Sequence, residues 1–522
     1  MTHSPRNSLD LAPAQTTLFE ALLAARKRLG GGRQALTDGD ERTLTYDEII
    51  RAAFALGNAL KRGTQPGENI GILLPTGVGS ILSFFALSAY GRVPAMLNFT
   101  AGQQNLTAAL DAAAITRVIT AHKFIAVGKF QAVEAALAAR ATLIYLEDVR
   151  TNLSVLDKAA ALLGSVAPWM VGTRAKPDEP AVILFTSGTE GEPKGVALSH
   201  ANILSNVQQV RAHLEFFDND VVFNPLPTFH SFGLTVGSLM PLYVGIRSVL
   251  HPTPRQPREI VGRVRKHGAT ILLATDTFIS QYVRVADHDD LKSLRLAVCG
   301  AERLRDETRH LVLSKCAAEL IEGYGVTEAS PVLSANQPGG NHPGTVGRLL
   351  PGIETRVDDV EGIHNGGRLF VRGPNIMLGY LRPERPGIIE PPKDGWHDTG
   401  DVVAIDDEFY ISIRGRLKRF AKIGGESVSL TIVENCASAL WPDDTHAAIA
   451  VPDGRKGEQI VLLTTHPTAS RSDFVSWVQN HGVTELAVPR RVLYVAEITA
   501  LGTGKTDYMA ARKYVEGLDG AN

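Results

Sequence analysis

Short apolar segments that alternate with alanine-rich helical stretches constrain the fold of this chain more than any other feature. Alternation of this kind is typical of a mostly parallel β-sheet that is covered by helices. Ligands usually bind such sheets at the loops that follow the strands. The sequence therefore predicts an α/β fold with a site at the strand ends. The expected strands are Asn69–Leu74, Arg117–Thr120, Leu143–Leu146, Ala181–Phe185, Ser248–His251 and Leu294–Cys299.

The length of the chain, 522 residues, exceeds what one hydrophobic core normally holds, so we expect at least two domains. A large N-terminal domain of helix-covered sheets is expected over residues 1–416. From about residue 340, short strands with Gly/Pro turns predict a β-rich subdomain at about 340–416. A small α+β C-terminal domain is expected over residues 417–522, with strands at His446–Val451 and Gln459–Thr464.

Two segments allow local predictions. Thr45-Tyr-Asp-Glu48 has the pattern of a capping box, which predicts that an amphipathic helix begins there. The uncharged run Gly71–Gly91 is the best candidate for a membrane span, but Pro75 and four glycines interrupt it. We therefore expect a strand, a turn and a buried helix over Ser80–Tyr90. No membrane span is expected, although a peripheral contact with a membrane stays open.

Composition and charge argue against several classes of protein. Hydrophobic residues make up 44% and charged residues 21% of the chain, as in ordinary soluble globular proteins. The formal net charge of −2 gives no reason to expect nucleic-acid binding. Three widely spaced cysteines fit neither a disulfide framework nor a zinc site, which favours a reducing compartment. Because Met1–Ala12 also lacks the layout of a signal peptide, we expect a cytoplasmic protein.

The strongest sign of chemistry is the segment Thr186-Ser-Gly-Thr-Glu-Gly-Glu-Pro-Lys-Gly195, which directly follows an apolar strand. Three glycines let backbone N–H groups turn inward, three hydroxyls add donors and Lys194 adds positive charge, so the loop suits a polyphosphate. The lysine lacks the spacing of a Walker A motif, and Val196–Ser199 is predicted as a strand rather than a helix. An ordinary Gly/Ser hairpin turn is the alternative.

Four further segments carry groups that suit a nucleotide site. In Glu322-Gly-Tyr-Gly-Val-Thr-Glu328, an aromatic ring flanked by glycines can lie against a purine, and a carboxylate suits Mg²⁺. In Gly395-Trp-His-Asp-Thr-Gly-Asp401, the last carboxylate could bind both ribose hydroxyls. The other two segments are Gly415-Arg-Leu-Lys-Arg-Phe-Ala-Lys-Ile-Gly-Gly-Glu426 and Gly502-Thr-Gly-Lys505.

In this order and spacing, the five segments resemble those of the acyl-adenylate-forming (ANL, AMP-binding) superfamily. That superfamily includes acyl-CoA synthetases, firefly luciferase and the adenylation domains of peptide synthetases. The resemblance runs from about Leu44 to Lys505. It implies the ANL fold with a mobile C-terminal domain, and ATP and Mg²⁺ as cofactors. The implied reaction activates a carboxylate as an acyl-adenylate and then passes it to a phosphopantetheine thiol, carried by an acyl carrier protein or by CoA.

The resemblance also implies roles in nucleotide binding for single residues. The β- and γ-phosphates of ATP would be held by Thr186, Ser187, Gly188, Thr189 and Lys194. The adenine would be framed by Gly300, Ala301, Glu302 and Tyr324, with Gly325 completing that segment. Thr327 would contact the α-phosphate, Glu328 would hold Mg²⁺, and Asp401 and Arg416 would bind the ribose.

Further implied roles concern catalysis and motion. Lys505 would reach both the substrate carboxylate and the α-phosphate and stabilise the charge that develops during attack. The C-terminal domain would swing about Lys418, bringing Gly424, Gly425 and Glu426 in to line a thiol tunnel.

His230, in the loop Phe223–Gly237, would occupy the gate over the acyl site. Small and apolar residues around it would leave a channel for an alkyl chain. A turn histidine whose ring is satisfied by the backbone is the alternative interpretation.

One departure from the common superfamily pattern and two further segments suggest a subfamily. Glu190 replaces the usual hydroxyl residue of the phosphate loop, and the segments Met96–Gly102 and Arg416–Glu426 are also distinctive. Together they resemble the acyl-ACP synthetase half of the bacterial acyl-ACP synthetase/2-acylglycerophosphoethanolamine acyltransferase. Because the synthetase region begins within the first fifty residues, we expect the acyltransferase half to be missing.

Two questions stay open at the level of sequence. The basic residues Arg414, Arg416, Lys418, Arg419 and Lys422 could form a solvated face, or a docking surface for an acidic carrier protein or for the CoA phosphates. The leading function is a fatty acyl-ACP or acyl-CoA synthetase. The alternatives are an adenylation enzyme that loads an unusual acid onto a dedicated carrier, and a non-catalytic nucleotide- or acyl-binding protein.

Overall fold

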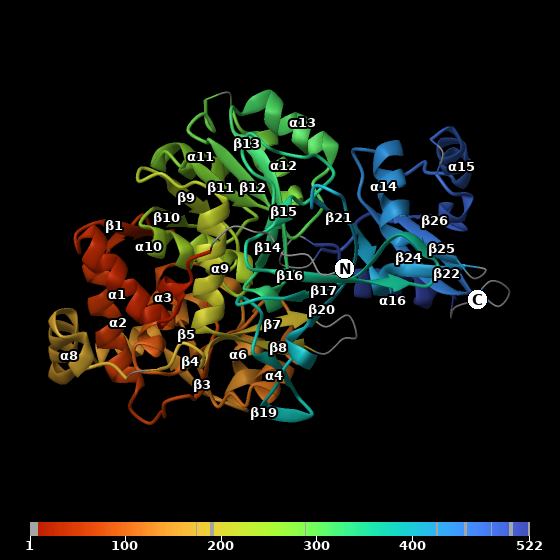
Figure 1. The fold of residues 1–522 in the computed structure, drawn as a ribbon. Coiled ribbons are helices and arrows are strands. Elements are labelled where there is room, and N and C mark those ends of the chain that lie inside the picture. The colour runs from red at the N-terminus through yellow and green to blue at the C-terminus, as the bar shows by residue number, and fades with distance from the viewer. Residues whose placement is uncertain are drawn as a thin grey trace.

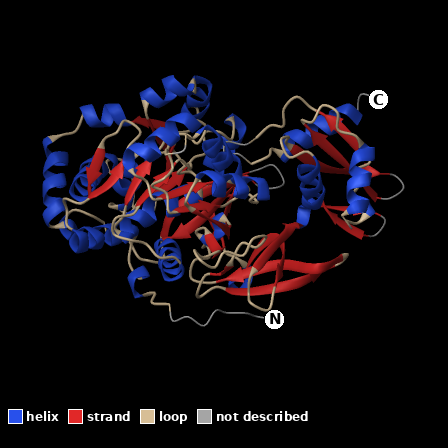
Figure 2. Ribbon diagram, turned by 90° about the horizontal axis from the view of Figure 1, so that it is seen from above, coloured by secondary structure: helices blue, strands red, loops and turns tan. Residues whose placement is uncertain are grey.

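The computed structural model describes residues 9–173, 175–187, 193–287, 289–423, 426–453, 457–481, 483–500 and 505–519. It shows a large body built on two helix-covered sheets, an antiparallel β-sheet beside it, and a smaller C-terminal unit at one side (Figures 1 and 2). This is the α/β architecture that the strand–helix alternation predicts.

The first large sheet has eight strands in the order β19-β18-β8-β7-β4-β3-β5-β6. Its central strands are parallel, whereas β8 and β18 run antiparallel to their neighbours. The strands are β3 (Asn69–Ile72), β4 (Val93–Met96), β5 (Arg117–Thr120), β6 (Thr142–Tyr145), β7 (Pro180–Ser187), β8 (Pro193–Ser199), β18 (Gly379–Arg382) and β19 (Arg385–Glu390).

The second large sheet has nine strands in the order β15-β14-β13-β12-β11-β9-β10-β1-β2. It is parallel from β1 to β13 across its middle and antiparallel at both edges. The strands are β1 (Gln34–Thr37), β2 (Thr43–Thr45), β9 (Val221–Asn224), β10 (Arg247–Leu250), β11 (Ile271–Ala274), β12 (Leu296–Cys299), β13 (Glu319–Gly325), β14 (Val332–Ala335) and β15 (Arg348–Leu349).

Helices cover both sheets, and one continuous core joins the sheets through helices α3 and α9. In Figure 1, α9 crosses the middle of the large body. Alternate residues of a strand face opposite layers: Val182 and Leu184 of β7 enter this shared core, whereas Ile183 enters a second cluster on the far face. The helices of the large body are α1 (Leu18–Leu29), α2 (Tyr46–Leu60), α3 (Val78–Ser88), α4 (Gln103–Ala112), α5 (His122–Gly128), α6 (Gln131–Ala138), α7 (Leu146–Thr151), α8 (Val155–Val166), α9 (His200–His213), α10 (Met240–Val244), α11 (Pro257–His267), α12 (Asp276–Val285) and α13 (Asp306–Lys315).

An antiparallel sheet follows the two large ones, in the order β16-β17-β20-β21. Its strands are β16 (Glu354–Val360), β17 (Ile363–Arg372), β20 (His397–Ile405) and β21 (Ile411–Arg416). The C-terminal unit comprises β22 (Phe420–Ile423), β23 (Glu426–Ser429), α14 (Leu430–Leu440), β24 (His446–Asp453), β25 (Gly457–Thr464), α15 (Arg471–Asn480), β26 (Arg491–Tyr494) and α16 (Tyr508–Asp519). Two core clusters, drawn only from residues 421–515, cover the two faces of its sheet.

The local sequence predictions agree with these elements, with small shifts at their ends. The capping box at Thr45 and Glu48 is present, and α2 begins directly after Thr45. Leu146 begins helix α7 and does not end the preceding strand, because β6 stops at Tyr145. The run Gly71–Gly91 folds as the end of β3, a turn and the buried helix α3. Among the described residues, no helix is long and apolar enough to cross a membrane.

Gly347 fixes how the second large sheet meets β21, and its replacement should destabilise the fold. Its φ is +78°, and a Cβ atom there would lie 1.9 Å from the carbonyl carbon of Ala335. We expect Gly347→Ala to lower the free energy of unfolding by about 2–4 kcal/mol. Gly262→Ala, in the interior of α11 with no atom within 4 Å of the added methyl, is the matched control.

Urea denaturation of both variants measures this difference. Because alanine favours a helix over glycine, the control should be neutral or more stable by up to about 1 kcal/mol. Equal stability of Gly347→Ala and the wild type would contradict this account of the junction.

Candidate active site

A buried carboxylate, Asp401, lies at the centre of the candidate site. It pairs with Arg416 across β20 and β21, with 3.1 Å between Asp401 Oδ1 and Arg416 Nε. The hydroxyl of Tyr324, at the end of β13, donates to Asp401 Oδ2 at 2.5 Å. Burial raises the pKa of Asp401, whereas Arg416, the Tyr324 hydrogen bond and the Lys505 charge lower it. Three residues that the sequence assigns to adenine and ribose therefore meet at one point.

Glu328 lies on the other side of the segment that follows β13, in the short 3₁₀-helix η4 (Thr327–Ala329). Tyr380 of β18 donates its hydroxyl to Glu328 Oε1 at 2.7 Å. The ring of Tyr380 also lies 5.6 Å from the ammonium nitrogen of Lys194, within the range of a cation–π contact. Sequence reasoning missed Tyr380, because 52 residues separate it from Glu328 and no local pattern marks it.

The predicted phosphate loop begins as a hairpin between β7 and β8. Thr186 and Lys194 are paired across the two strands, and β8 confirms the strand expected after the loop. Ser187 ends β7, opposite Pro193. Gly188 and Thr189 lie outside the described residues. The hairpin therefore places Lys194 beside the ring of Tyr380, whose hydroxyl contacts Glu328.

The segment Gly300–Glu302 directly follows β12, next to the end of β13 in the parallel sheet. A Cβ atom on Gly300 would lie 3.1 Å from the ring of Phe232, so this glycine lets the ring approach the backbone. Ala301 has a φ of +69°. Glu302 Oε2 accepts a hydrogen bond from the backbone N–H of Thr277 at 3.1 Å. Burial raises the pKa of Glu302, whereas hydrogen bonds from Thr277 and the charge of Lys505 lower it.

The turn after Tyr324 is held rigidly. A Cβ atom on Gly325 would lie 2.1 Å from the carbonyl oxygen of Pro331, so only glycine fits without a backbone shift. Asn375 donates to the carbonyl oxygen of Ala329 at 2.8 Å, and Ser330 donates to that of Asn375 at 2.9 Å. These contacts fix the positions of Thr327 and Glu328 relative to β18. The hydroxyl of Thr327 also accepts a hydrogen bond from Ser231 at 3.4 Å.

His230 lies at the entrance to an unusual π-helix, η3 (Phe232–Leu239). Its Nε2 atom is buried and has no hydrogen-bond partner, in contrast to a turn histidine satisfied by the backbone. Burial lowers the pKa of His230 to about 3, and the Lys505 charge adds to the effect. The imidazole is therefore neutral near pH 7, with an unpaired polar atom close to the cluster of site residues.

Two glycines and the side chains of Asn224 and Ser238 hold the π-helix in its conformation. A Cβ atom on Gly233 would lie 2.3 Å from the carbonyl oxygen of Pro227, and one on Gly237 would lie 2.3 Å from the Asn224 side chain. Asn224 and Ser238 both donate to the carbonyl oxygen of Gly233, each at 2.9 Å. Because π-helices are rare and often occur at functional sites, this segment supports a role for the loop predicted as the acyl gate.

Lys505 comes from the C-terminal unit, a few residues before α16, and is half-buried. Burial lowers its pKa and Arg416 lowers it further, whereas Glu302 and Asp401 raise it. In turn, its charge acts on the pKa of Asp401, Glu302 and His230. The structure thus brings Lys505 together with three of the residues predicted for the N-terminal part of the site.

Tyr508, three residues after Lys505, anchors this segment to its own unit. The guanidinium carbon of Arg419 lies 3.4 Å from the centre of the Tyr508 ring. Glu434 of α14 accepts hydrogen bonds from Arg419 at 2.8 Å and from the Tyr508 hydroxyl at 3.2 Å. The start of α16 is therefore tied to the residue that directly follows Lys418.

The structure separates one member of the basic cluster, Arg419, from the other four. Arg419 is largely buried in its contacts with Glu434 and Tyr508, and Arg416 pairs with Asp401. Lys418 lies between them in the 3₁₀-helix η6 (Leu417–Arg419). Arg414, Arg416, Lys418 and Lys422 are exposed, so four of the five basic residues face solvent and only Arg419 is withdrawn from the surface. Glu426 begins β23 and is exposed, whereas Gly424 and Gly425 lie outside the described residues.

Comparison with protein families identifies the chain at this point. The family model described as "AMP-binding enzyme" matches residues 23–381, which is more than half of the chain. The chain belongs to the AMP-binding enzyme family. The superfamily inferred from the five motifs is therefore confirmed.

Curated relatives of this AMP-binding enzyme include several ligases. A feruloyl-CoA synthase from an Amycolatopsis species is 29% identical over 481 residues, covering 88% of this chain and 92% of that protein. A medium-chain fatty-acid–CoA ligase from Escherichia coli strain K12 is 30% identical over 348 residues, covering 64% of this chain and 61% of that ligase. A long-chain-fatty-acid–CoA ligase from Salmonella typhimurium is 29% identical over 338 residues, covering 62% of this chain. The match spans 60% of that Salmonella ligase.

Solved structures match the AMP-binding enzyme over nearly its whole length. ATP-bound MatB from Rhodopseudomonas palustris has a TM-score of 0.81 at 25% identity, covering 96% of this chain and 99% of that chain. The anthranilate CoA ligase AuaEII in complex with anthranoyl-AMP has a TM-score of 0.80 at 22% identity, covering 96% and 98%. These matches confirm the predicted fold, including the smaller C-terminal unit.

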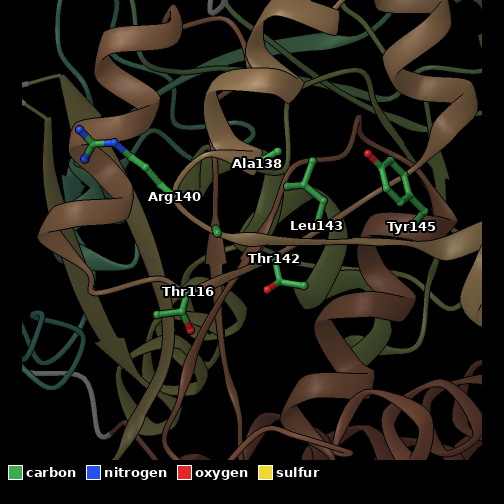
Figure 3. Close-up of a pocket in the computed structure, with 7 residues that line it drawn as sticks. Thr116, Ala138, Arg140, Thr142, Leu143 and Tyr145 are labelled. Carbon is green, nitrogen blue, oxygen red and sulfur yellow. The ribbon is translucent and has the colours of Figure 1, made fainter.

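A surface hollow of about 570 Å³ lies elsewhere, at the edge strand β6. Arg140 and Tyr145 stand at opposite ends of it (Figure 3). Both are already paired, Arg140 with Asp111 and Tyr145 with Glu134. None of the predicted site residues lines this hollow, so it does not mark the candidate active site of the AMP-binding enzyme.

The buried Nε2 atom of His230, which has no hydrogen-bond partner, allows a direct test of the site's electrostatics. We expect the His230 ring to stay neutral between about pH 4.5 and 8, because burial lowers its pKa from 6.5 to about 3. Nuclear magnetic resonance on histidine-labelled protein can follow this ring, with His230→Gln used to assign its signal. A titration midpoint near the ordinary histidine value would contradict the buried position. As the pH falls below 6.5, His230 lowers the free energy of unfolding, because the unfolded chain takes up a proton at this ring and the folded protein does not.

Proposed function

We propose that this protein is an ATP-dependent, AMP-forming acid–thiol ligase. A substrate carboxylate attacks the α-phosphorus of ATP, forming an acyl-adenylate and releasing pyrophosphate. A thiolate then attacks the acyl carbon, and AMP leaves. The observation that carries this proposal is the convergence of Lys505, from the C-terminal unit, on Asp401, Glu302 and His230.

The geometry supports an assignment of ATP to this site. Tyr324 and the segment Gly300–Glu302 would frame the adenine, with Gly325 shaping the turn. Asp401 and Arg416 would bind the ribose. Their bonds to its hydroxyls would replace part of their contact with each other. Thr186 and Lys194, with Ser187, Gly188 and Thr189 of the same loop, would hold the β- and γ-phosphates.

Glu328 and Thr327 would face the triphosphate from the other side. Among the described residues, no cluster of three or more His, Cys, Asp and Glu side chains could hold a metal alone. One carboxylate fits Mg²⁺, which usually takes its remaining oxygen ligands from phosphates and water. When bound, the ion would neutralise phosphate charge. The hydroxyl of Thr327 would contact the α-phosphate.

Electrostatics explains why the site needs a lysine from the second unit. Attack of a carboxylate on a triphosphate brings two anions together, so cationic groups must reduce their repulsion. Lys505 would lie between them and stabilise the charge that develops. Because the acyl-adenylate is hydrolysed in open water, closure by the C-terminal unit would also protect it.

The substrate class that we propose is an alkyl carboxylate of medium or long chain. The π-helix beside His230 is built from glycines and apolar residues, which suits an apolar channel. Relatives named as medium- and long-chain fatty-acid ligases support this choice. The relative named as a feruloyl-CoA synthase makes an aromatic acid the alternative outcome.

CoA is the acceptor that the names of the relatives favour. An acyl carrier protein is the acceptor that the subfamily resemblance implies. Of the basic cluster, Arg419 is engaged within the protein, whereas Arg414, Arg416, Lys418 and Lys422 stay exposed and could meet the phosphates of CoA or an acidic carrier. We place the reaction in the cytoplasm.

Pyrophosphate release across a panel of acids and thiols tests the proposed function. The assay contains ATP and Mg²⁺ with CoA, holo-acyl carrier protein or no thiol. Fast turnover with a fatty acid and CoA is the expected result. Turnover only with the holo-carrier would identify a free-standing acyl-ACP synthetase. Absence of pyrophosphate release with every fatty and aromatic acid would overturn the assignment of substrate class.

Replacing Lys505 should separate binding from catalysis. We expect Lys505→Ala to slow adenylate formation by about 100- to 1,000-fold, because its charge acts mainly in the transition state. The dissociation constant of ATP, measured by calorimetry, should change little. Lys513→Ala, which removes an exposed lysine from α16, is the matched control and should keep the wild-type rate. A full rate in Lys505→Ala would refute the role.

Rotation of the C-terminal unit about Lys418 is part of the proposal. We infer domains at residues 1–416 and 417–522, because the two core clusters of the second unit contain only residues 421–515. After adenylation, rotation would withdraw Lys505 and bring Gly424, Gly425 and Glu426 to the thiol path.

Lys418→Pro tests this rotation, because proline fixes φ at the proposed hinge. We expect the thioester step, measured from isolated acyl-adenylate, to slow by on the order of tenfold or more while adenylation is spared. Equal loss in both half-reactions would count against a hinge at this position.

A further inference from the structure

Tyr380 of β18 contacts two opposite charges of the candidate active site. Its hydroxyl donates to Glu328 Oε1 at 2.7 Å, and its ring centre lies 5.6 Å from the ammonium nitrogen of Lys194. In the part of the chain that the structure describes, no ion pair joins these two charges directly. One side chain therefore binds a carboxylate through its hydroxyl and a cation through its ring.

The pairing of β8 with β18 places Lys194 next to this ring. Tyr380 is the Cα partner of Val196 in the antiparallel ladder. Residues that pair directly point to one face of a sheet, and so do residues two positions apart in a strand. Lys194 is therefore a diagonal neighbour of Tyr380 on the same face. The second cation at the ring, Arg382 at 5.3 Å, is already paired with Glu390 at 3.2 Å.

Glu328 is held at its backbone as well as at its side chain. The backbone N–H of Met377, three residues before Tyr380, donates to the carbonyl oxygen of Glu328 at 2.8 Å. The segment 377–380 thus contacts both the main chain and the carboxylate of Glu328. The Tyr380 ring in turn meets the ring of the buried His397 edge-on, with 6.4 Å between their centres. These contacts fix the direction in which the carboxylate points.

The hydrogen bond engages one oxygen of the Glu328 carboxylate and leaves the other available. Among the described residues, Oε2 accepts no hydrogen bond. Burial raises the pKa of Tyr380, and the charge and hydrogen bond of Glu328 raise it further, so the hydroxyl stays a donor near neutral pH. Mg²⁺ prefers oxygen ligands, and carboxylates that bind metals are usually hydrogen-bonded by a neighbouring group. The contact of Tyr380 with Glu328 has this form.

We propose that Tyr380 is a positioning residue that holds Glu328 toward Mg²⁺ and keeps Lys194 from pairing with Glu328 before ATP binds. A lysine and a glutamate in contact would neutralise each other, and ATP would have to separate them. The face of the ring attracts the ammonium group, while the hydroxyl binds the carboxylate. The roles of Glu328 and Lys194 rest on the proposed function, whereas the contacts of Tyr380 do not.

Tyr380→Phe tests the hydroxyl, because it removes the hydrogen bond and keeps the ring. Calorimetry without an acid substrate measures the dissociation constant of ATP, once with excess Mg²⁺ and once with EDTA. We expect the variant to raise the constant with Mg²⁺ by about tenfold and to leave the constant with EDTA nearly unchanged. The matched control is Tyr145→Phe, which removes a hydroxyl that donates to Glu134 at 2.5 Å at the far edge of the same sheet. It should match the wild type in both measurements.

Tyr380→Leu tests the ring. We expect Lys194 then to pair with Glu328, so that ATP with EDTA binds more weakly. Adding Glu328→Gln should restore binding, by a factor at least about threefold larger than the same substitution gains in the wild type. This comparison is needed because removing a carboxylate beside a triphosphate favours binding by itself. Circular dichroism checks that each variant folds, and Tyr380→Phe still decides the proposal if Tyr380→Leu does not fold.

Four outcomes would overturn the proposal. Equal weakening of both constants in Tyr380→Phe would show damage to the site and no positioning of the metal ligand. Equal gains from Glu328→Gln in the two backgrounds would show that the ring does not keep the charges apart. Wild type that binds ATP equally well with Mg²⁺ and with EDTA would remove the metal role of Glu328 and leave the nucleotide site intact. Wild type that binds no ATP would overturn the proposed function, and this inference with it.

Discussion

The buried carboxylate of Asp401 is the group on which the rest of the site depends. An unpaired charge in such a place is costly, so the fold must supply partners for it. Tyr324 comes from the second large sheet and Arg416 from the last strand of the antiparallel sheet. The same interaction therefore joins two sheets, and under the proposed function its carboxylate would bind the ribose. Arg416 also lies directly before the segment at which the C-terminal unit begins.

The C-terminal unit contributes the charge of Lys505 to this cluster, and contacts within the unit hold the neighbouring segment in place. Arg419, Glu434 and Tyr508 tie the start of α16 to the segment after Lys418. Lys505 lies three residues before Tyr508, so a rotation of the unit would move its charge with it. In the arrangement seen here, that charge acts on the pKa values of Asp401, Glu302 and His230, and under the proposed function this is the arrangement for attack on ATP.

Much of the fold was predictable, because the signals are local. The capping box at Thr45 and the strand that follows the predicted phosphate loop depend on neighbours within a few residues. Tyr380 was not predictable, since its contact with Glu328 joins distant strands through tertiary packing. The burial of Arg419 against Glu434 was unpredictable for the same reason, because a run of charges does not reveal which member pairs within the protein.

The most direct test of the central claim, that this protein activates a carboxylate as an adenylate, is to follow one oxygen atom. A fatty acid labelled with ¹⁸O in its carboxylate is incubated with the enzyme, ATP, Mg²⁺ and CoA, and the nucleotide products are analysed by mass spectrometry. If the carboxylate attacks the α-phosphorus, one labelled oxygen must appear in AMP when the thiol displaces it. Label in inorganic phosphate together with ADP would show attack at the γ-phosphorus, and would contradict the account.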